Sequence, residues 1–165
     1  MHIEQRQRTN ELLRMRGITH ALFANQHTVT WLTGFAPPIQ LGGNLFAGGP
    51  SLLWYDAGHY TLLTLDALAG VAGDLSADAD CDVATYPGYT IERPIESARQ
   101  QAEALQRLVG RLGDAVSVGV EIASLPVALG SALAATGITQ WTAIDGWLTD
   151  LRMVKTDEEL AKPVR

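Results

Sequence analysis

Two patterns of apolar residues alternate along this chain. Short apolar runs of strand length occupy residues 19–24, 51–55, 60–65, 82–86, 116–121 and 138–144. Segments with apolar residues three and four positions apart occupy residues 3–16, 94–112, 124–137 and 145–152. The first pattern is typical of buried strands and the second of amphipathic helices. The alternation predicts an α/β fold.

The sheet is expected to be mixed. Two of the strand-like runs flank the four residues "DAGH" at 56–59, which is a signal for a tight antiparallel hairpin. The strand–helix–strand units elsewhere in the chain favour parallel pairing. We therefore predict one mixed β-sheet with helices on both faces.

The clearest amphipathic helix is predicted over 94–112, with Pro94 in its first turn. Its apolar stripe comprises Ile95, Ala98, Ala102, Leu105, Leu108, Val109 and Leu112. Polar side chains of Arg99, Glu103, Gln106 and Arg107 are expected to face outward. Two glycines, Gly17 and Gly137, are expected to end helices, and Ser124 to cap the helix that Gly137 ends.

Composition excludes several classes of protein. The chain has 165 residues, 47% of them hydrophobic and only 18% charged, and this length fits one domain with a proper core. A net charge of −6 repels phosphate backbones, so nucleic acid is excluded as the expected partner. The single cysteine, Cys81, fits a cytoplasmic protein. The uncharged stretch 17–55 is broken by three prolines, so no membrane span is expected.

Catalytic machinery is not visible in the sequence, and the prediction for catalytic and metal-binding residues is none. The four histidines lack the spacing of a zinc pair, and no Gly-rich phosphate loop or G-x-S-x-G motif occurs. The acidic run at 74–82 starts like a calcium loop but has Val83 and Tyr89 where Gly and Glu are required. That run is interpreted as a solvated turn.

Three short strings carry more information than the rest. "TVTWLTGF" at 28–35 is interpreted from its residues as a core-packing turn, and "GVE" at 119–121 as a strand end or helix cap. "LTDLRMVKTDEEL" at 148–160 ends in a capping box, because Thr156 is followed three residues later by Glu159. Pro163 follows within about a turn, so a helix begins that this chain does not continue.

These strings, in this order, resemble the N-terminal domain of the creatinase/prolidase/Xaa-Pro aminopeptidase family of pita-bread metallohydrolases. The matching pieces are "GITHALFA", Asn25 with "WLTGF", "SLLWY", "GVEIASLP" and "LRMVKTDEEL". The series spans nearly the whole chain. After "DEEL", however, this sequence has "AKPVR" where family members usually continue a long helix.

The resemblance implies a non-catalytic α/β domain over residues 1–152, with 153–165 as the start of a linker to a C-terminal catalytic domain. In the family that second domain holds a dinuclear divalent metal site, and the whole protein is a metal-dependent aminopeptidase or amidinohydrolase-type hydrolase. This chain alone is expected to be inactive and to bind no cofactor. Its implied role is to frame the substrate pocket and to help build a homodimer.

The charge-free loop at 34–50 is the expected place for contact with a partner. An exposed loop without charge but with large apolar residues is typical of a covered surface. The resemblance places this region near a substrate pocket, so Trp31, Phe35, Gln40, Asn44 and Phe46 are predicted at or near an intersubunit or interdomain surface.

Two other interpretations remain open from the sequence. The chain could be a stand-alone small-molecule-binding or regulatory α/β domain in which 34–50 forms a ligand loop. It could also be an orphan fragment with no function of its own. A downstream coding sequence bearing the metal ligands would separate the first interpretation from these two.

Overall fold

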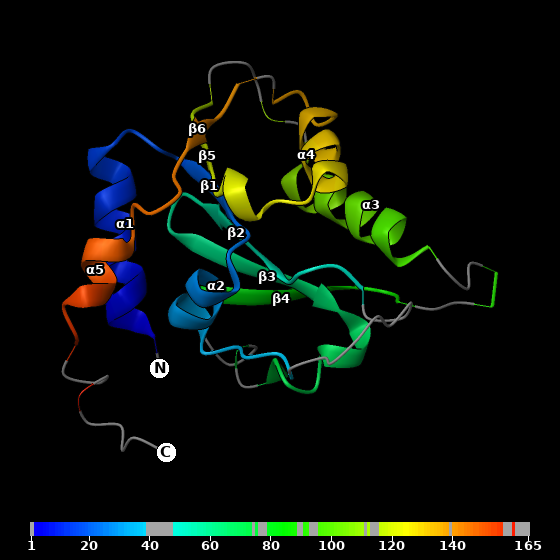
Figure 1. The fold of residues 1–165 in the computed structure, drawn as a ribbon, viewed down its shortest axis with the longest axis horizontal. Coiled ribbons are helices and arrows are strands. Elements are labelled where there is room, and N and C mark those ends of the chain that lie inside the picture. The colour runs from blue at the N-terminus through cyan, green and yellow to red at the C-terminus, as the bar shows by residue number, and fades with distance from the viewer. Residues whose placement is uncertain are drawn as a thin grey trace.

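A six-stranded mixed sheet forms the centre of the computed structural model, with helices on both sides (Figure 1). The structure describes residues 2–38, 48–73, 75, 79–88, 91–92, 96–110, 112, 116–138, 140–156 and 160. The strands are β1 (His20–Phe23), β2 (Leu52–Asp56), β3 (His59–Leu65), β4 (Cys81–Tyr86), β5 (Val118–Val120) and β6 (Thr142–Ala143). The α-helices are α1 (Ile3–Met15), α2 (Gln26–Thr33), α3 (Ser97–Val109), α4 (Val127–Ala134) and α5 (Thr149–Met153).

The sheet has the strand order β4-β3-β2-β1-β5-β6. The β2–β3 hairpin is antiparallel, and β1 also pairs antiparallel with β2. The pairs β3–β4, β1–β5 and β5–β6 are parallel. The predicted α/β class and mixed sheet are therefore confirmed. No helix of the described residues is long and apolar enough to cross a membrane.

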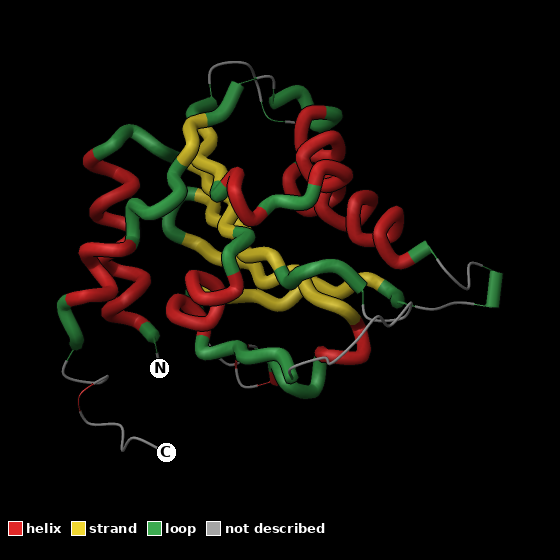
Figure 2. The backbone as a smooth tube through the Cα atoms, in the orientation of Figure 1, coloured by secondary structure: helices red, strands yellow, loops and turns green. Residues whose placement is uncertain are grey.

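Residues alternate between two hydrophobic cores along the central strands, as the two-residue period of a strand requires. In β1, Ala21 and Phe23 join one core, whereas Leu22 joins the other. The first core lies under α1, α2 and α5, and the second lies under α3 and α4 (Figure 2). The sheet thus separates two helical layers.

Helix α1 lies beside α5 and fixes the end of that helix (Figure 1). The guanidinium of Arg8 donates hydrogen bonds to the carbonyl oxygens of Leu151 at 2.8 Å and Val154 at 2.9 Å. These carbonyls belong to the last turn of α5, where no backbone partner is available within the helix. At the C-terminal end of α1, the Arg16 guanidinium lies 4.7 Å from the ring centre of Trp147.

Helix α3 buries a different set of residues at its start from the set that its apolar spacing predicted. Leu105 and Val109 are buried as expected, but Ala98 is exposed and Gln101 is buried. The Gln101 side chain donates a 2.6 Å hydrogen bond to the carbonyl of Pro50, and this bond offsets the cost of burying an amide. The helix begins at Ser97, later than predicted, and Ile95 and Pro94 lie outside the described residues.

Three local predictions were wrong. Residues 28–35 pack in the core as predicted, but most of them form helix α2, with Gly34 as its C-cap, and not a turn. Ser124 does not cap α4, because it lies in a 3₁₀ turn over Ile122–Ser124 and α4 starts after Pro126. The last strand is only the two residues of β6 rather than the whole of 138–144.

Candidate functional site

The buried carboxylate of Glu121 joins two of the strings that the sequence analysis singled out. Glu121 follows β5 and is only 5% exposed. Its Oε2 accepts hydrogen bonds from the backbone N–H groups of Ala24 at 2.9 Å and Asn25 at 2.8 Å, and its Oε1 accepts one from the Thr28 hydroxyl at 2.7 Å. Asn25 is itself the N-cap of α2 and accepts from the N–H of His27. Glu121, the last residue of "GVE", therefore fixes the start of α2, the helix that contains most of "WLTGF".

Burial is the largest influence on Glu121 and raises the pKa of its carboxyl. The hydrogen bonds from Asn25, Thr28 and Ala24 oppose that rise, and the nearby Asp145 carboxylate adds to it. Asp145 has a related role, since its two carboxylate oxygens accept from the N–H groups of Ile122 and Ala123 at 3.0 Å. Both carboxylates accept hydrogen bonds from backbone N–H groups, so we assign them structural roles.

Glycine is required at the other end of α2. Gly34 has a φ of +76°, a left-handed conformation that suits glycine, and its N–H donates to the carbonyl of Thr30 at 2.7 Å. A Cβ at this position would lie 2.6 Å from Nε2 of His2. The His2 ring is fixed there because its Nδ1 donates to the carbonyl of Trp31 at 2.9 Å. Gly34, the glycine of "WLTGF", thus ends the helix and also leaves room for the His2 ring to pack close to the backbone.

Of the five residues predicted at a partner surface, the structure describes two. Trp31 is 9% exposed and Phe35 is 2% exposed, and both belong to the core under α1 and α2. Gln40, Asn44 and Phe46 lie outside the described residues. The chain itself therefore encloses the side chains of Trp31 and Phe35, and their place at a partner surface stays a prediction.

The chain is firmly held where it leaves the predicted loop. The Tyr86 hydroxyl accepts a 3.0 Å hydrogen bond from the N–H of Gly49, and Gln101 binds the next carbonyl, that of Pro50. The side-chain amide of Gln26 then donates to the carbonyl of Ser51 at 2.8 Å. Three different elements thus fix the entry to β2. Neither Tyr86 nor Gln101 was singled out from the sequence, because an isolated polar residue carries no pattern.

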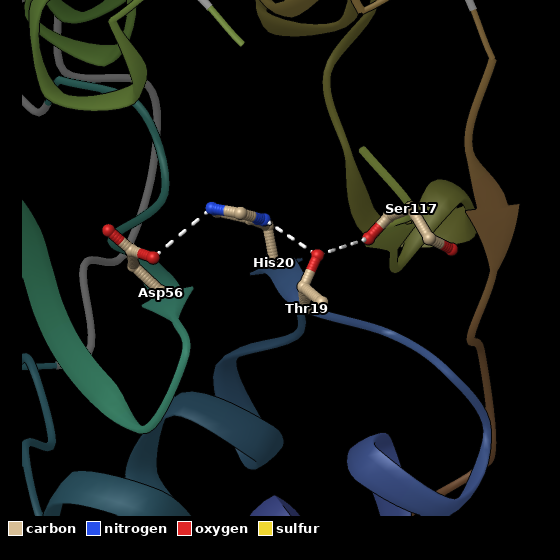
Figure 3. A network of polar contacts seen from close by, with 4 residues as sticks. All are labelled: Thr19, His20, Asp56 and Ser117. Carbon is tan, nitrogen blue, oxygen red and sulfur yellow. Dashed lines mark hydrogen bonds and ion pairs between the residues drawn. The ribbon is translucent and has the colours of Figure 1, made fainter. Parts of the chain in front are cut away.

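A second polar network ties β1 to its two neighbouring strands (Figure 3). His20 Nε2 lies 3.1 Å from Oδ1 of Asp56, and His20 Nδ1 lies 2.9 Å from Oγ1 of Thr19. The Thr19 hydroxyl also lies 3.4 Å from the carbonyl of Ser117, before β5. His20 and Asp56 are direct neighbours across the β1–β2 pair. The order hydroxyl, imidazole, carboxylate is that of a nucleophilic relay, but these contacts serve strand pairing.

Within the described ranges, no group of three or more His, Cys, Asp or Glu side chains could hold a metal ion. The described residues therefore offer no ligand set for the dinuclear metal site that the resemblance implies.

Solved structures that are similar to this chain include a proline dipeptidase, a prolidase and an Xaa-Pro dipeptidase. A proline dipeptidase from Streptococcus pneumoniae TIGR4 superposes with a TM-score of 0.65 at 16% identity, covering 91% of this chain and 98% of that one. The prolidase from Pyrococcus horikoshii OT3 superposes with a TM-score of 0.64 at 18% identity, covering 95% of this chain but 37% of that one. The Xaa-Pro dipeptidase from Bacillus anthracis gives 0.63 at 15% identity, with 97% and 38% covered.

The fold is thus that of an α/β domain which occupies a little over a third of the longer of these chains. The family model of the Creatinase/Prolidase N-terminal domain matches residues 5–154, which is most of the sequence. This chain belongs to that family. A comparison with curated proteins found no match.

Proposed function

We propose that this chain is the non-catalytic first domain of a prolidase-type metallohydrolase, and that it frames the substrate pocket of a C-terminal catalytic domain. The proposal rests on how much of each chain the structural match covers. The match covers 95% of this chain but only 37% of the Pyrococcus prolidase, so catalysis would lie in the remainder of such a protein. The dinuclear divalent metal site expected from the family would belong to that other domain.

We expect the isolated chain to bind no stoichiometric divalent metal and to hydrolyse no Xaa-Pro dipeptide. The reason is the lack of a ligand group among the described residues. Purified chain, incubated with Mn²⁺ and then desalted, should be analysed for bound metal and assayed with alanyl-proline. One or more tightly bound metal ions together with turnover would overturn the proposal.

The proposal also includes a homodimer formed through the segment 34–50 and a cytoplasmic location. The location is supported by Cys81, which is buried as a thiol and not in a disulfide. The dimer is supported by the lack of charge in this apolar segment. Burial of Phe35 in the chain's own core makes that residue unsuitable for a test of the dimer, so Phe46 is preferred.

We expect Phe46→Ser to weaken self-association, because it removes a large apolar side chain from the segment predicted to be covered. Sedimentation velocity over a range of concentrations measures the effect. Ile91→Ser is the matched control, because Ile91 is an apolar side chain that is 87% exposed and lies elsewhere in the chain. Equal monomeric behaviour of wild type and both variants at high concentration would contradict the dimer.

A further inference from the structure

A cavity of about 610 Å³ lies between the end of α1 and the turn of the β2–β3 hairpin. This volume is within the usual range of small-molecule sites, about 300–1,000 Å³. Its lining comes from three short segments: Asn10, Glu11 and Arg14 of α1, Gly17 to Thr19 before β1, and Tyr55, Ala57 and Gly58 of the hairpin. No other described residue lines this cavity.

The inner wall of this cavity is apolar and fixed. Ile18 is 3% exposed and Tyr55 is 5% exposed, because both side chains also belong to the core of the sheet. The Tyr55 ring also packs against that of Tyr60 on the neighbouring strand, with the ring centres 5.2 Å apart. An apolar group of a ligand would therefore meet a wall that is already in place.

The rim of the cavity carries one basic and one acidic side chain, and both are exposed. Glu11 and Arg14 are exposed and are i, i+3 neighbours on α1, and neither has an ion pair or side-chain hydrogen bond within the described residues. Arg99 on α3, by contrast, lies 3.0 Å from Glu103. Beside the two charges, Asn10 accepts a 2.7 Å hydrogen bond from Tyr60, which leaves its amide N–H groups for another acceptor.

The hairpin side of the cavity is held in an unusual conformation. Ala57 has a φ of +46°, and it is the only non-glycine residue with positive φ in the described part of the chain. Two-residue turns of this kind usually have Asn or Gly at that position, since alanine is strained there. The N–H of Ala57 donates to the carbonyl of Thr19 at 3.0 Å, and this bond holds the turn against the opposite wall. Such strain often accompanies binding sites.

We propose that this cavity binds a small zwitterion, either a free amino acid or a dipeptide. Arg14 and the Asn10 amide would take the carboxylate, Glu11 would take the ammonium group, and the side chain of the ligand would lie against Ile18 and Tyr55. Charge-assisted hydrogen bonds at both ends select for a ligand with both charges. The proposal is independent of the proposed catalytic partner domain, since all lining residues belong to this chain.

The test is a titration of ¹⁵N-labelled chain followed by the amide resonances of Gly17, Ala57 and Gly58. The probes are leucine, alanyl-leucine, N-acetyl-alanyl-leucine and alanyl-leucine amide. Saturable shifts are expected with the zwitterions, and blocking either end of the dipeptide should weaken binding by up to about fivefold, as for loss of an exposed ion pair. Leucine and alanyl-leucine together show whether the site takes an amino acid, a dipeptide or both.

Two variants make the assignment specific. Arg14→Gln should abolish the preference for alanyl-leucine over its amide but keep the preference over the acetylated form, and Glu11→Gln should do the reverse. Arg107→Gln and Glu4→Gln remove exposed charges that do not line the cavity and should change neither preference. The proposal fails if no probe gives saturable shifts, if blocked and unblocked dipeptides bind equally, or if the control variants have the same effect as the cavity variants.

Discussion

Replacing Glu121 by alanine is expected to lower the free energy of unfolding by about 3–5 kcal/mol, because it leaves three donors without an acceptor. Those donors are the N–H groups of Ala24 and Asn25 and the Thr28 hydroxyl, all within 2.9 Å of the carboxylate. Denaturation in urea at neutral pH, followed by tryptophan fluorescence, measures the loss. A change under 1 kcal/mol would mean that water replaces the carboxylate at no great cost, and that Glu121 does not fix α2.

Glu121→Gln is the matched control and also tests the pH dependence. Burial holds the pKa of Glu121 above its ordinary value of 4.5, so the folded protein retains a proton that the unfolded chain has released. The stability that this proton contributes is present below pH 4.5 and is lost as the pH rises through the raised folded pKa. Glutamine does not ionise, so the variant should show a flatter profile of stability against pH over that range. An unchanged slope would contradict the assignment.

Replacing Leu105 by alanine is expected to cost about 2–5 kcal/mol, as for other large-to-small changes in a packed core. Leu105 is fully buried between α3 and the sheet, in the core that also contains Leu133 of α4. Urea denaturation again gives the free energy. Arg107→Ala, two residues away on the exposed side of the same helix, is the control and should change stability by less than about 0.5 kcal/mol. Equal effects of the two changes would show that α3 packs through another face.

The fold was predictable because its strongest signals are periodic. The buried stripe around Leu105 repeats at helical spacing, and the β2–β3 hairpin shows as two short apolar runs on either side of a turn sequence. Helix α2 was missed because its sequence, "QHTVTWLT", is short and rich in β-branched and aromatic residues, which have low helix propensity. Glu121, nearly a hundred residues away in sequence, fixes its start, because it accepts from the N–H groups of Ala24 and Asn25 just before the helix and from the Thr28 hydroxyl in its first turn. A long-range cap of this kind leaves no local pattern.

The candidate site was predictable only in part, and for a similar reason. Asn25 and Glu121 were found through the strings that contain them, but nothing in either string indicated that they would meet. The cavity beside α1 was not foreseen at all. Its residues come from three separate segments, and the φ of Ala57 in particular depends on a hydrogen bond to Thr19 that only the folded chain makes.

The two hydrogen bonds from Arg8 have a mechanical consequence. They attach the last turn of α5 to α1, so the residues up to Val154 move as part of the domain. Thr156, two residues further on, is only 2% exposed, so the chain stays packed against the domain past the end of α5. A segment attached beyond Thr156 would therefore rotate about a point after that residue and not within α5. Arg8 thus helps to set the direction in which the chain leaves α5.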